Sequence, residues 1–323
     1  MSVRLLQAAA VMGGLLLASA ASAQGLFNPV TFTLENGLEV VVLPRARVPA
    51  VVQMVWYRVG SADEPPGKGG IAHFLEHLMF KGTPSVAPGD LSKLVARNGG
   101  RDNAFTNQDY TGYYQTVAAD RLELVMRLES DRMANLVLTD AEVDPEREVV
   151  LEERRSRTDN QPSALLSEQM RAALFLSHNY RNPVIGWAWE ISGLTRDDAL
   201  AFYRRHYAPN NAILVVAGDV TVERVRELAT QYYGPIPRRD VPPRVRFQEP
   251  PHQAARRIEL RSEQVREPSW RRFYLAPSYS GGGETRHAYA LQVLMQLLGG
   301  DNTSRLWRTV VVEGSVSSYP YHA

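Results

Sequence analysis

The sequence predicts an α+β fold with a largely antiparallel sheet, because strand-like runs and amphipathic helical segments follow one another along the chain. The strand-like runs are short, rich in Val, Thr and aromatic residues, and bounded by turn residues. With 323 residues and 44% hydrophobic content, the chain is long enough for roughly two domains of ~150 residues each. A Pro-rich stretch late in the chain divides it unequally, so we expect one complete domain followed by a shorter unit.

Residues 1–23 have the features of a secretory signal peptide, which is removed and takes no part in the fold. Arg4 gives a positive n-region, residues 5–17 are mostly apolar, and Ala21-Ser22-Ala23 is an A-x-A site, so cleavage is expected after Ala23. A membrane anchor is the alternative, but the apolar run is shorter than the ~20 residues that a span needs. No later segment resembles a span. The sequence therefore predicts a periplasmic or secreted protein.

The charge balance and the absence of cysteine exclude several kinds of site. The chain has 36 Lys and Arg against 35 Asp and Glu, and removal of Arg4 with the leader leaves 35 of each, a net charge of zero. This balance offers no support for nucleic acid or an anionic membrane surface as a partner. Without cysteine there are no disulfides and no thiolate ligands, so any metal must be held by histidine and carboxylates.

The complete domain begins with a hairpin and a buried strand. Residues 29–43 contain two strand-like runs on either side of a Glu-Asn-Gly turn. Residues 51–59 are strongly apolar and should lie centrally in the sheet. Residues 60–70 form a polar loop that leads into a helix, and Gly69-Gly70 allows that helix to start close against other backbone.

The helix that follows carries His73, Glu76 and His77 in the order His-x-x-Glu-His. Because His73 and His77 are at positions i and i+4, both imidazoles leave one helix face, and Glu76 borders that face. A catalytic zinc site needs two neutral imidazoles and an adjacent carboxylate from one helix, as two ligands and a general base. The alternative is that His73 is a buried core residue among apolar neighbours. A third ligand elsewhere in the chain would favour the zinc site over the buried core histidine.

Further helices and strands complete the domain. A helix is predicted over residues 88–97, and residues 102–117 form two strand-like runs about the Asn107-Gln108-Asp109 turn. Residues 120–136 place their apolar side chains on one helix face. Later helices are predicted over residues 168–176, 196–206 and 222–233, and a strand over residues 212–217.

A glutamate-rich helix is predicted to begin at Asp144, its N-cap, with Pro145 at the first helical position. Glu146 and Glu153 are two turns apart and share a face, whereas Glu152 points roughly 100° away. Glutamate in a first turn is also favoured by the helix dipole, and the later charges could form a solvated face. Spacing alone therefore does not show that Glu153 meets the histidines.

Several separated motifs, in order, resemble the insulinase/pitrilysin (inverzincin) family of zinc metallopeptidases, of the short bacterial, processing-peptidase-like type. His73-x-x-Glu76-His77 is followed by Glu153 at an offset of 153 − 77 = 76 positions, about where the family has its third ligand. Further matches are Gly82-Thr83, Asn103-Ala104-Phe105-Thr106 and Tyr207-Ala208-Pro209-Asn210-Asn211 followed by residues 214–220. The likeness covers about residues 30–234 and continues more weakly to Arg308.

The resemblance implies one catalytic Zn²⁺ held by His73, His77 and Glu153, with a fourth position for the attacking water. Glu76 would take the proton of that water and later pass it to the leaving amine. Glu146 would accept the second ring N–H of a ligand histidine. The alternative for Glu146 is a simple interaction with the helix dipole.

The resemblance also implies that Asn103, Ala104 and Phe105 bind a peptide substrate. Their strand would offer main-chain groups to an extended peptide, with Asn103 positioning the scissile carbonyl. An ordinary strand edge is the alternative. The other histidines lack a ligand-spaced partner and are expected to be structural or exposed; they are His178, His206, His252, His287 and His322.

We expect a zinc-binding catalytic domain over residues 24–234, a Pro-rich linker over 235–255 and an incomplete second domain over 256–323. In the second domain, residues 257–264 and 270–279 are predicted strands and residues 287–298 a helix. The resemblance implies that this domain has the same α+β type and is inactive, and its length suggests truncation.

Active members of the family also use an Arg and a Tyr seven residues apart, after a tripeptide like Ser304-Arg305-Leu306. By that register Val311 and Ser318 stand in their place, so the pair is missing. The sequence therefore predicts an exported zinc endopeptidase for short or unfolded peptides, with a homologous partner subunit that supplies the pair. The alternative is a catalytically incomplete subunit that binds zinc or peptide without turnover.

Overall fold

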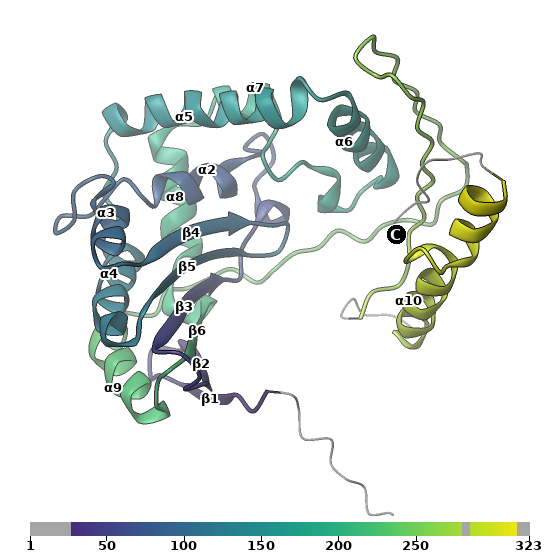
Figure 1. Ribbon diagram of the computed structural model, residues 1–323. Coiled ribbons are helices and arrows are strands. Elements are labelled where there is room, and N and C mark those ends of the chain that lie inside the picture. The colour runs from purple at the N-terminus through teal and green to yellow at the C-terminus, as the bar shows by residue number, and fades with distance from the viewer. Residues whose placement is uncertain (1–26, 280–284, 315–323) are drawn as a thin grey trace, which may run out of the picture. The chain divides into compact units, whose positions relative to one another are not determined.

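The computed structural model describes residues 27–279 and 285–314. The chain divides into two compact units, one ending at Gln264 and the other starting at Val265. The first unit contains the sheet and most of the helices (Figure 1).

Six strands of the described residues form one sheet, in the order β1-β2-β6-β3-β5-β4. Their bounds are β1 Val30–Thr33, β2 Glu39–Pro44, β3 Ala50–Tyr57, β4 Arg101–Thr106, β5 Thr111–Ala118 and β6 Ala212–Gly218. Every neighbouring pair is antiparallel except β2 with β6, which run parallel. The predicted α+β fold with a largely antiparallel sheet is confirmed, and β3 lies inside the sheet as expected.

Strand β3 shows how the sequence pattern makes the core. Every second residue from Val51 to Tyr57 is buried, and Val55 and Tyr57 are fully inaccessible. Gln53 is the polar exception on this buried face, and its amide donates to Gln115 on β5 at 3.0 Å. The polar donor on this face therefore finds its partner on the adjacent strand.

Helices pack on the sheet and on one another. Their bounds are α2 Ile71–Leu78, α3 Asp90–Arg97, α4 Leu122–Asn135, α5 Asp140–Arg154, α6 Pro162–Leu174, α7 Ala188–Ser192, α8 Arg196–His206 and α9 Val222–Tyr232. Helix α4 contacts β3 and β5, and α9 contacts β2. Helix α2 contacts β4 and β5 on one side and α5 on the other, so it lies between the sheet and α5 (Figure 1).

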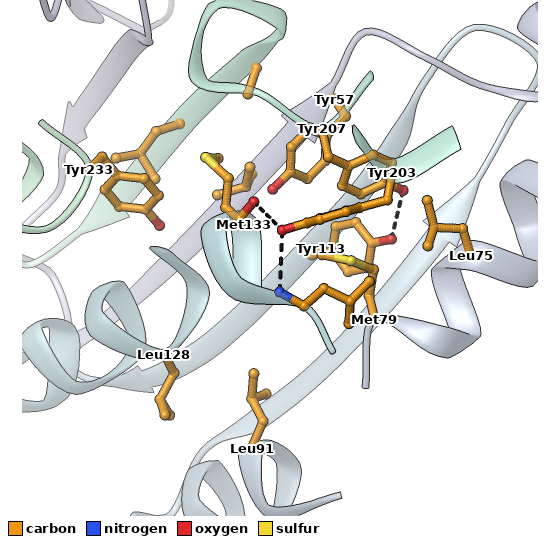
Figure 2. Packing of buried hydrophobic residues seen from close by; sticks show 14 of the residues in the cluster. Tyr57, Leu75, Met79, Leu91, Tyr113, Leu128, Met133, Tyr203, Tyr207 and Tyr233 are labelled. Carbon is orange, nitrogen blue, oxygen red and sulfur yellow. Dashed lines mark hydrogen bonds between the residues drawn. The ribbon is translucent and has the colours of Figure 1, made fainter. Parts of the chain in front are cut away.

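The core beneath these helices is rich in tyrosine (Figure 2). The hydroxyls of Tyr113 and Tyr207 lie 2.9 Å apart, and Tyr203 donates to the main-chain oxygen of Met133 at 2.7 Å. These three buried hydroxyls pair with each other or with the backbone, which offsets the cost of removing them from water.

The start of α5 differs from the prediction. The helix begins at Asp140 and its N-cap is Thr139, so the predicted N-cap at Asp144 was wrong. The side chain of Glu142 accepts the main-chain N–H of Thr139 at 2.8 Å, which makes a capping box that starts the helix earlier. Pro145 therefore lies inside the helix. The spacing of the glutamates is unaffected, because the helix is only extended at its N-terminal end.

The predicted linker contains no helix or strand, but it lies along the first unit. Arg246 bridges Asp63 and Asp109, with a nitrogen–oxygen distance of 2.6 Å to each. Glu249 accepts the main-chain N–H groups of residues 176–178 at 2.7–3.0 Å. Residues 235–255 are thus tied to the first unit, and the domain limits at residues 234 and 255 stay a prediction.

In the second unit, α10 Arg286–Gly299 matches the predicted helix. The strands predicted over residues 257–264 and 270–279 are not formed, so that prediction was wrong. β-Propensity does not suffice for a strand, because its main-chain groups need a partner backbone and an isolated hairpin is marginal in water.

Three sequence predictions lie outside the described residues, namely the signal peptide over residues 1–23, Ser318 in place of the family tyrosine, and His322. Within residues 27–279 and 285–314, no helix combines the length and the apolar character needed to cross a membrane.

Candidate metal centre

Helix α2 starts where two backbone segments meet. Gly70 has a φ of 90°, and a Cβ there would lie 2.7 Å from the main-chain oxygen of Ile185. Gly186 faces it with the same φ of 90°, and a Cβ at that position would lie 2.6 Å from the Cα of Gly70. The close approach expected from Gly69-Gly70 is therefore present, and it requires glycine on both sides.

Glu64 holds the first turn of α2. Its two carboxylate oxygens accept the main-chain N–H groups of Gly70 and Ala72, each at 3.0 Å. These are donors that the start of a helix otherwise leaves without a partner. Burial raises the pKa of Glu64 well above its usual range, although both hydrogen bonds favour the ionised form. The helix that carries the histidines is thereby fixed at its N-terminal end.

His73 and His77 leave the same face of α2, with ring centroids 4.8 Å apart. Phe74, Leu75 and Leu78 are fully buried on the rest of the helix. Because these apolar residues anchor the helix in the core, they determine where the histidine face points. The imidazole side chains remain 12% and 22% exposed, so both are accessible from solvent.

Glu153, in the last turn of α5, completes the group. Its Oε2 lies 3.6 Å from His73 Nε2 and 3.3 Å from His77 Nε2. In a tetrahedral zinc site with bonds of about 2.0–2.2 Å, neighbouring ligand atoms are about 3.3–3.6 Å apart. Both nitrogen–oxygen separations are thus close to those that such an ion needs. They form the one trio among the described His, Asp and Glu residues whose ligand atoms all lie within 4.8 Å.

Glu76 lies on the same helix and is only 9% exposed. Thr106 on β4 donates to its Oε2 at 2.5 Å. Burial raises the pKa of Glu76, and the Thr106 hydrogen bond and the nearby His77 oppose that rise. A carboxylate whose pKa is raised towards neutrality is suited to accepting and returning a proton.

Glu146 lies on the Nδ1 side of the His77 ring, whereas Glu153 lies on the Nε2 side. Its Oε1 is 2.8 Å from His77 Nδ1, and its Oε2 is paired with Lys81. The hydrogen bond from His77 and the Lys81 partner lower the pKa of Glu146 to about 2. Burial lowers the pKa of His77, but the bonds to Glu146 and Glu153 outweigh burial and raise it to about 9. With Nδ1 held in this way, the Nε2 of His77 faces Glu153.

His73 has no corresponding partner. Its Nδ1 is buried and makes no hydrogen bond within the part of the chain that the structure describes. Burial and the neighbouring His77 lower the pKa of His73 to about 4. The imidazole is therefore neutral at neutral pH, which is the form that binds a metal ion.

The three residues predicted to bind substrate lie on β4, at one edge of the sheet. The side chain of Asn103 accepts the main-chain N–H of Ala104 at 2.9 Å. Phe105 packs edge-on against Trp56, with ring centroids 5.0 Å apart. Strand β4 pairs with β5 on one side only, and it contacts α2, so an edge open to a further strand lies beside the helix that carries His73 and His77 (Figure 1).

Four residues around the trio were missed from the sequence. They are Glu64, Lys81, Thr106 and Arg157, whose guanidinium contacts the second oxygen of Glu153. Arg157 follows Glu153 by four positions, a spacing that indicates a shared helix face. Lys81 lies beyond the end of α2 and pairs with Glu146 on another helix. Thr106 belongs to a recognised motif but had no role assigned. Glu64 lies in a loop, and no sequence pattern indicated that it would hold the start of α2.

Two family models match the chain. The model of the insulinase family, peptidase family M16, matches residues 40–187, and that of the peptidase M16 inactive domain matches residues 193–322. Every residue of the candidate site lies within the first match.

The chain is also similar to known proteins over most of its length. It is 34% identical to the zinc protease PqqE of Helicobacter pylori over 292 residues, which are 90% of this chain and 65% of that protein. It thus spans slightly less than two thirds of that relative. A crystal structure of a protease from Helicobacter pylori has a TM-score of 0.79 and 33% identity, covering 90% of this chain and 69% of that one.

The periplasmic protease PqqL of Escherichia coli is a further structural match, with a TM-score of 0.63 and 27% identity. The match covers 67% of this chain and 25% of PqqL. Together with the family models, these similarities show that the chain belongs to the insulinase family of peptidases, M16.

Proposed function

We propose that this M16 protein is an exported zinc-dependent endopeptidase that hydrolyses short or unfolded peptides. The observation that carries the proposal is the convergence of His73 Nε2, His77 Nε2 and Glu153 Oε2. Glu76, a general-base candidate, lies on the same helix. The names of the relatives, which are zinc proteases, support zinc as the ion.

His73, His77 and Glu153 would hold one Zn²⁺, which when bound supplies a Lewis acid that activates water and polarises a carbonyl. The carboxylate of Glu76 takes a proton from the attacking water and gives it to the leaving amine. Burial and the Thr106 hydrogen bond keep this carboxylate in one position between the two transfers. Glu146 orients His77 by accepting its Nδ1–H.

The substrate binds, in this proposal, as an extended strand along the outer edge of β4. Main-chain groups of residues 103–105 pair with the peptide, and Asn103 lies near the scissile carbonyl. Only a peptide without fixed structure can add to a sheet edge in this way, which explains the preference for short or unfolded substrates. The edge position of β4 and its contact with α2 support the arrangement.

Turnover in this proposal needs a second domain or a homologous partner subunit. In this sequence Val311 and Ser318 stand where active relatives have an Arg and a Tyr. The match of residues 193–322 to the inactive-domain model supports this need, because that part of the chain is of the type that does not carry the metal-binding motif. Export is supported by the signal-peptide features of residues 1–23 and by the periplasmic PqqL among the similar structures.

A second candidate function follows from the missing pair. The chain would then be a catalytically incomplete subunit that binds zinc or peptide in a heterodimeric peptidase. The presence of Glu76, which has no use in a subunit without turnover, favours the endopeptidase.

Zinc content and cleavage of a quenched fluorescent peptide test the proposal, for the protein alone and together with a homologous neighbouring-gene product. We expect one zinc per chain and cleavage in at least one condition, lost with a chelator and restored by added zinc. Glu76→Gln should keep the zinc and lower kcat by about 10²–10⁴-fold.

Glu152→Gln is the matched control, because Glu152 is exposed and pairs with Arg155 instead of the histidines. Zinc bound without cleavage in either condition would assign the incomplete-subunit function. A folded chain that binds no zinc would contradict both candidates.

A further inference from the structure

Arg157 reaches the candidate metal centre from a segment that ends α5. The helix continues into a short π-helical stretch, Arg155–Asp159, a local geometry that is frequent at functional sites. From there the Nη1 of Arg157 lies 2.5 Å from Oε1 of Glu153. Glu153 therefore turns Oε2 to the histidines and Oε1 to a guanidinium, so Arg157 is in direct contact with the trio.

Most of the Arg157 guanidinium is free for a further ligand. The side chain is 74% exposed, although Glu153 is only 15% exposed. A guanidinium has five N–H donors in a planar fork that matches a carboxylate, and the contact to Glu153 uses one edge of it. A guanidinium that is held by one contact to a proposed ligand and is otherwise exposed is suited to binding a substrate group.

The charge of Arg157 acts on the groups around it. Burial has the largest effect on the pKa of both His73 and Glu76, and Arg157 contributes a lowering to each. The hydrogen bond from His77 has the largest effect on the pKa of Glu153, and Arg157 again contributes a lowering. The positive charge of Arg157 thus acts on two of the proposed ligands and on Glu76.

The neighbouring cations do not have this position. Arg155 is 52% exposed but pairs with Glu152, which points away from the trio. Arg154 is buried and is bonded to Glu168 and to the main-chain oxygen of Gly186. Lys81 is occupied by Glu146. Among these four basic residues, Arg157 is the one that both contacts a proposed metal ligand and is widely exposed.

We propose that Arg157 is a specificity-determining residue that binds a carboxylate of the peptide substrate close to the scissile bond. This inference rests on the proposed function and deepens it, because it names the substrate class as peptides with an acidic group near the cleavage point. The carboxylate comes from an Asp or Glu side chain or from the C-terminus of the peptide. A Lys or Arg side chain at the same place is repelled.

The test compares matched quenched peptides that differ at one position beside the cleaved bond, as Asp, Asn or Lys. A second pair of peptides ends close to the bond as a free acid or an amide, which separates the two sources of the carboxylate. We expect kcat/KM for Asp to exceed that for Asn by about 2–5-fold, as for an ion pair at a largely exposed site.

The ratio of the two peptides within one variant is the readout, since it cancels any effect on metal binding or basal rate. Arg157→Gln should bring the Asp/Asn ratio to about one, and Arg157→Glu should favour the Lys peptide. Arg155→Gln is the matched control and should leave the ratio at the wild-type value. Loss of preference only in the free-acid pair would assign the C-terminal carboxylate.

Binding of fluorescein-labelled Asp and Asn peptides to zinc-loaded Glu76→Gln protein gives the same ratio without turnover. The inference is therefore tested even if the chain cleaves nothing, and its failure is separate from failure of the proposed function. Equal affinity and equal cleavage of the Asp and Asn peptides by protein with Arg157 would overturn it. So would an unchanged ratio in Arg157→Gln.

Discussion

The two ring nitrogens of His77 face two different carboxylates. Nε2 lies 3.3 Å from Glu153, and Nδ1 lies 2.8 Å from Glu146. A ligand imidazole binds through one nitrogen, so the bond at the other nitrogen sets the tautomer and the ring orientation. Lys81 neutralises the second oxygen of Glu146 and holds that carboxylate in place. The Glu146–Lys81 pair therefore supports His77 from the side away from the trio.

Replacing Glu146 by Gln should weaken zinc binding by about 10–100-fold, because the neutral amide is a poorer acceptor for the Nδ1–H of His77. Competition with a chromophoric chelator measures the affinity, and circular dichroism checks the fold. Glu148→Gln is the control, since Glu148 is exposed on the same helix. Equal zinc affinity in the two variants would show that His77 needs no ionised partner at Nδ1.

How much of this site the sequence could predict depended on which element holds each residue. His73, Glu76 and His77 lie on one helix, where spacing determines the shared face. Glu153 lies on another helix, so its approach to the histidines needed a family resemblance. Thr106 reaches Glu76 across the gap between strand and helix, which no local pattern encodes.

Helix α2 and the loop around Gly186 touch backbone to backbone. A Cβ on Gly186 would lie 2.6 Å from both the main-chain oxygen of Gly69 and the Cα of Gly70. Main-chain atoms cannot rotate away as a flexible side chain would, so any side chain there must separate the loop from the helix start. The loop in turn is held by Arg154, which donates to the Gly186 oxygen at 2.7 Å.

Gly186→Ala should lower the free energy of unfolding by about 2–4 kcal/mol, from the left-handed backbone together with the steric overlap. Urea denaturation measures it. Gly67→Ala is the control, because Gly67 has a similar φ of 78° but no atom within 4 Å of an added Cβ. The control should lose only about 1–2 kcal/mol. If both variants lost the same amount, the close approach at Gly186 would contribute nothing to stability.

The elements that were predicted well are those whose pattern is local. The hairpin of β1 and β2, the two strands about the 107–109 turn and helix α8 follow directly from alternation and amphipathic spacing. The start of α5 was misplaced because the Asp144-Pro145 signal competed with a capping box at Thr139 and Glu142. The strands expected over residues 257–264 and 270–279 are not formed, because a strand depends on a partner strand that propensity does not report.

Proline-rich composition correctly indicated that residues 235–255 have no regular structure, but it could not show where they lie. The segment binds the first unit through charged side chains, with Arg246 between Asp63 and Asp109. Arg244 of the same segment also pairs with Asp63. Long-range ion pairs of this kind join residues that are far apart in sequence, so composition and periodicity cannot reveal them.

One consequence of this packing is a buried neutral histidine. His206, in the last turn of α8, is only 8% exposed. Burial lowers the pKa of His206 to about 4; the nearby Asp63 opposes this effect, whereas Arg205 and Arg244 add to it. In the unfolded chain a histidine titrates near 6.5. The folded state therefore binds fewer protons than the unfolded state between these two values, and its stability falls as the pH is lowered through this range.

The contribution of His206 should be fully present above about pH 6.5, and about 2–2.5 kcal/mol of it should be lost between pH 7 and 4.5. Carboxylates with a lowered pKa, such as Glu146, lose their contribution only at lower pH, below about 4.3. Urea unfolding at pH 7, 6, 5 and 4.5 separates the two windows. His206→Gln should reduce the decline between pH 6.5 and 4.5 but leave the part due to His73, whose pKa is also lowered to about 4. His252→Gln, at an exposed position, should leave the decline unchanged. If His206→Gln showed the same decline as the unmodified protein, the pH dependence would come from the protonation of another group.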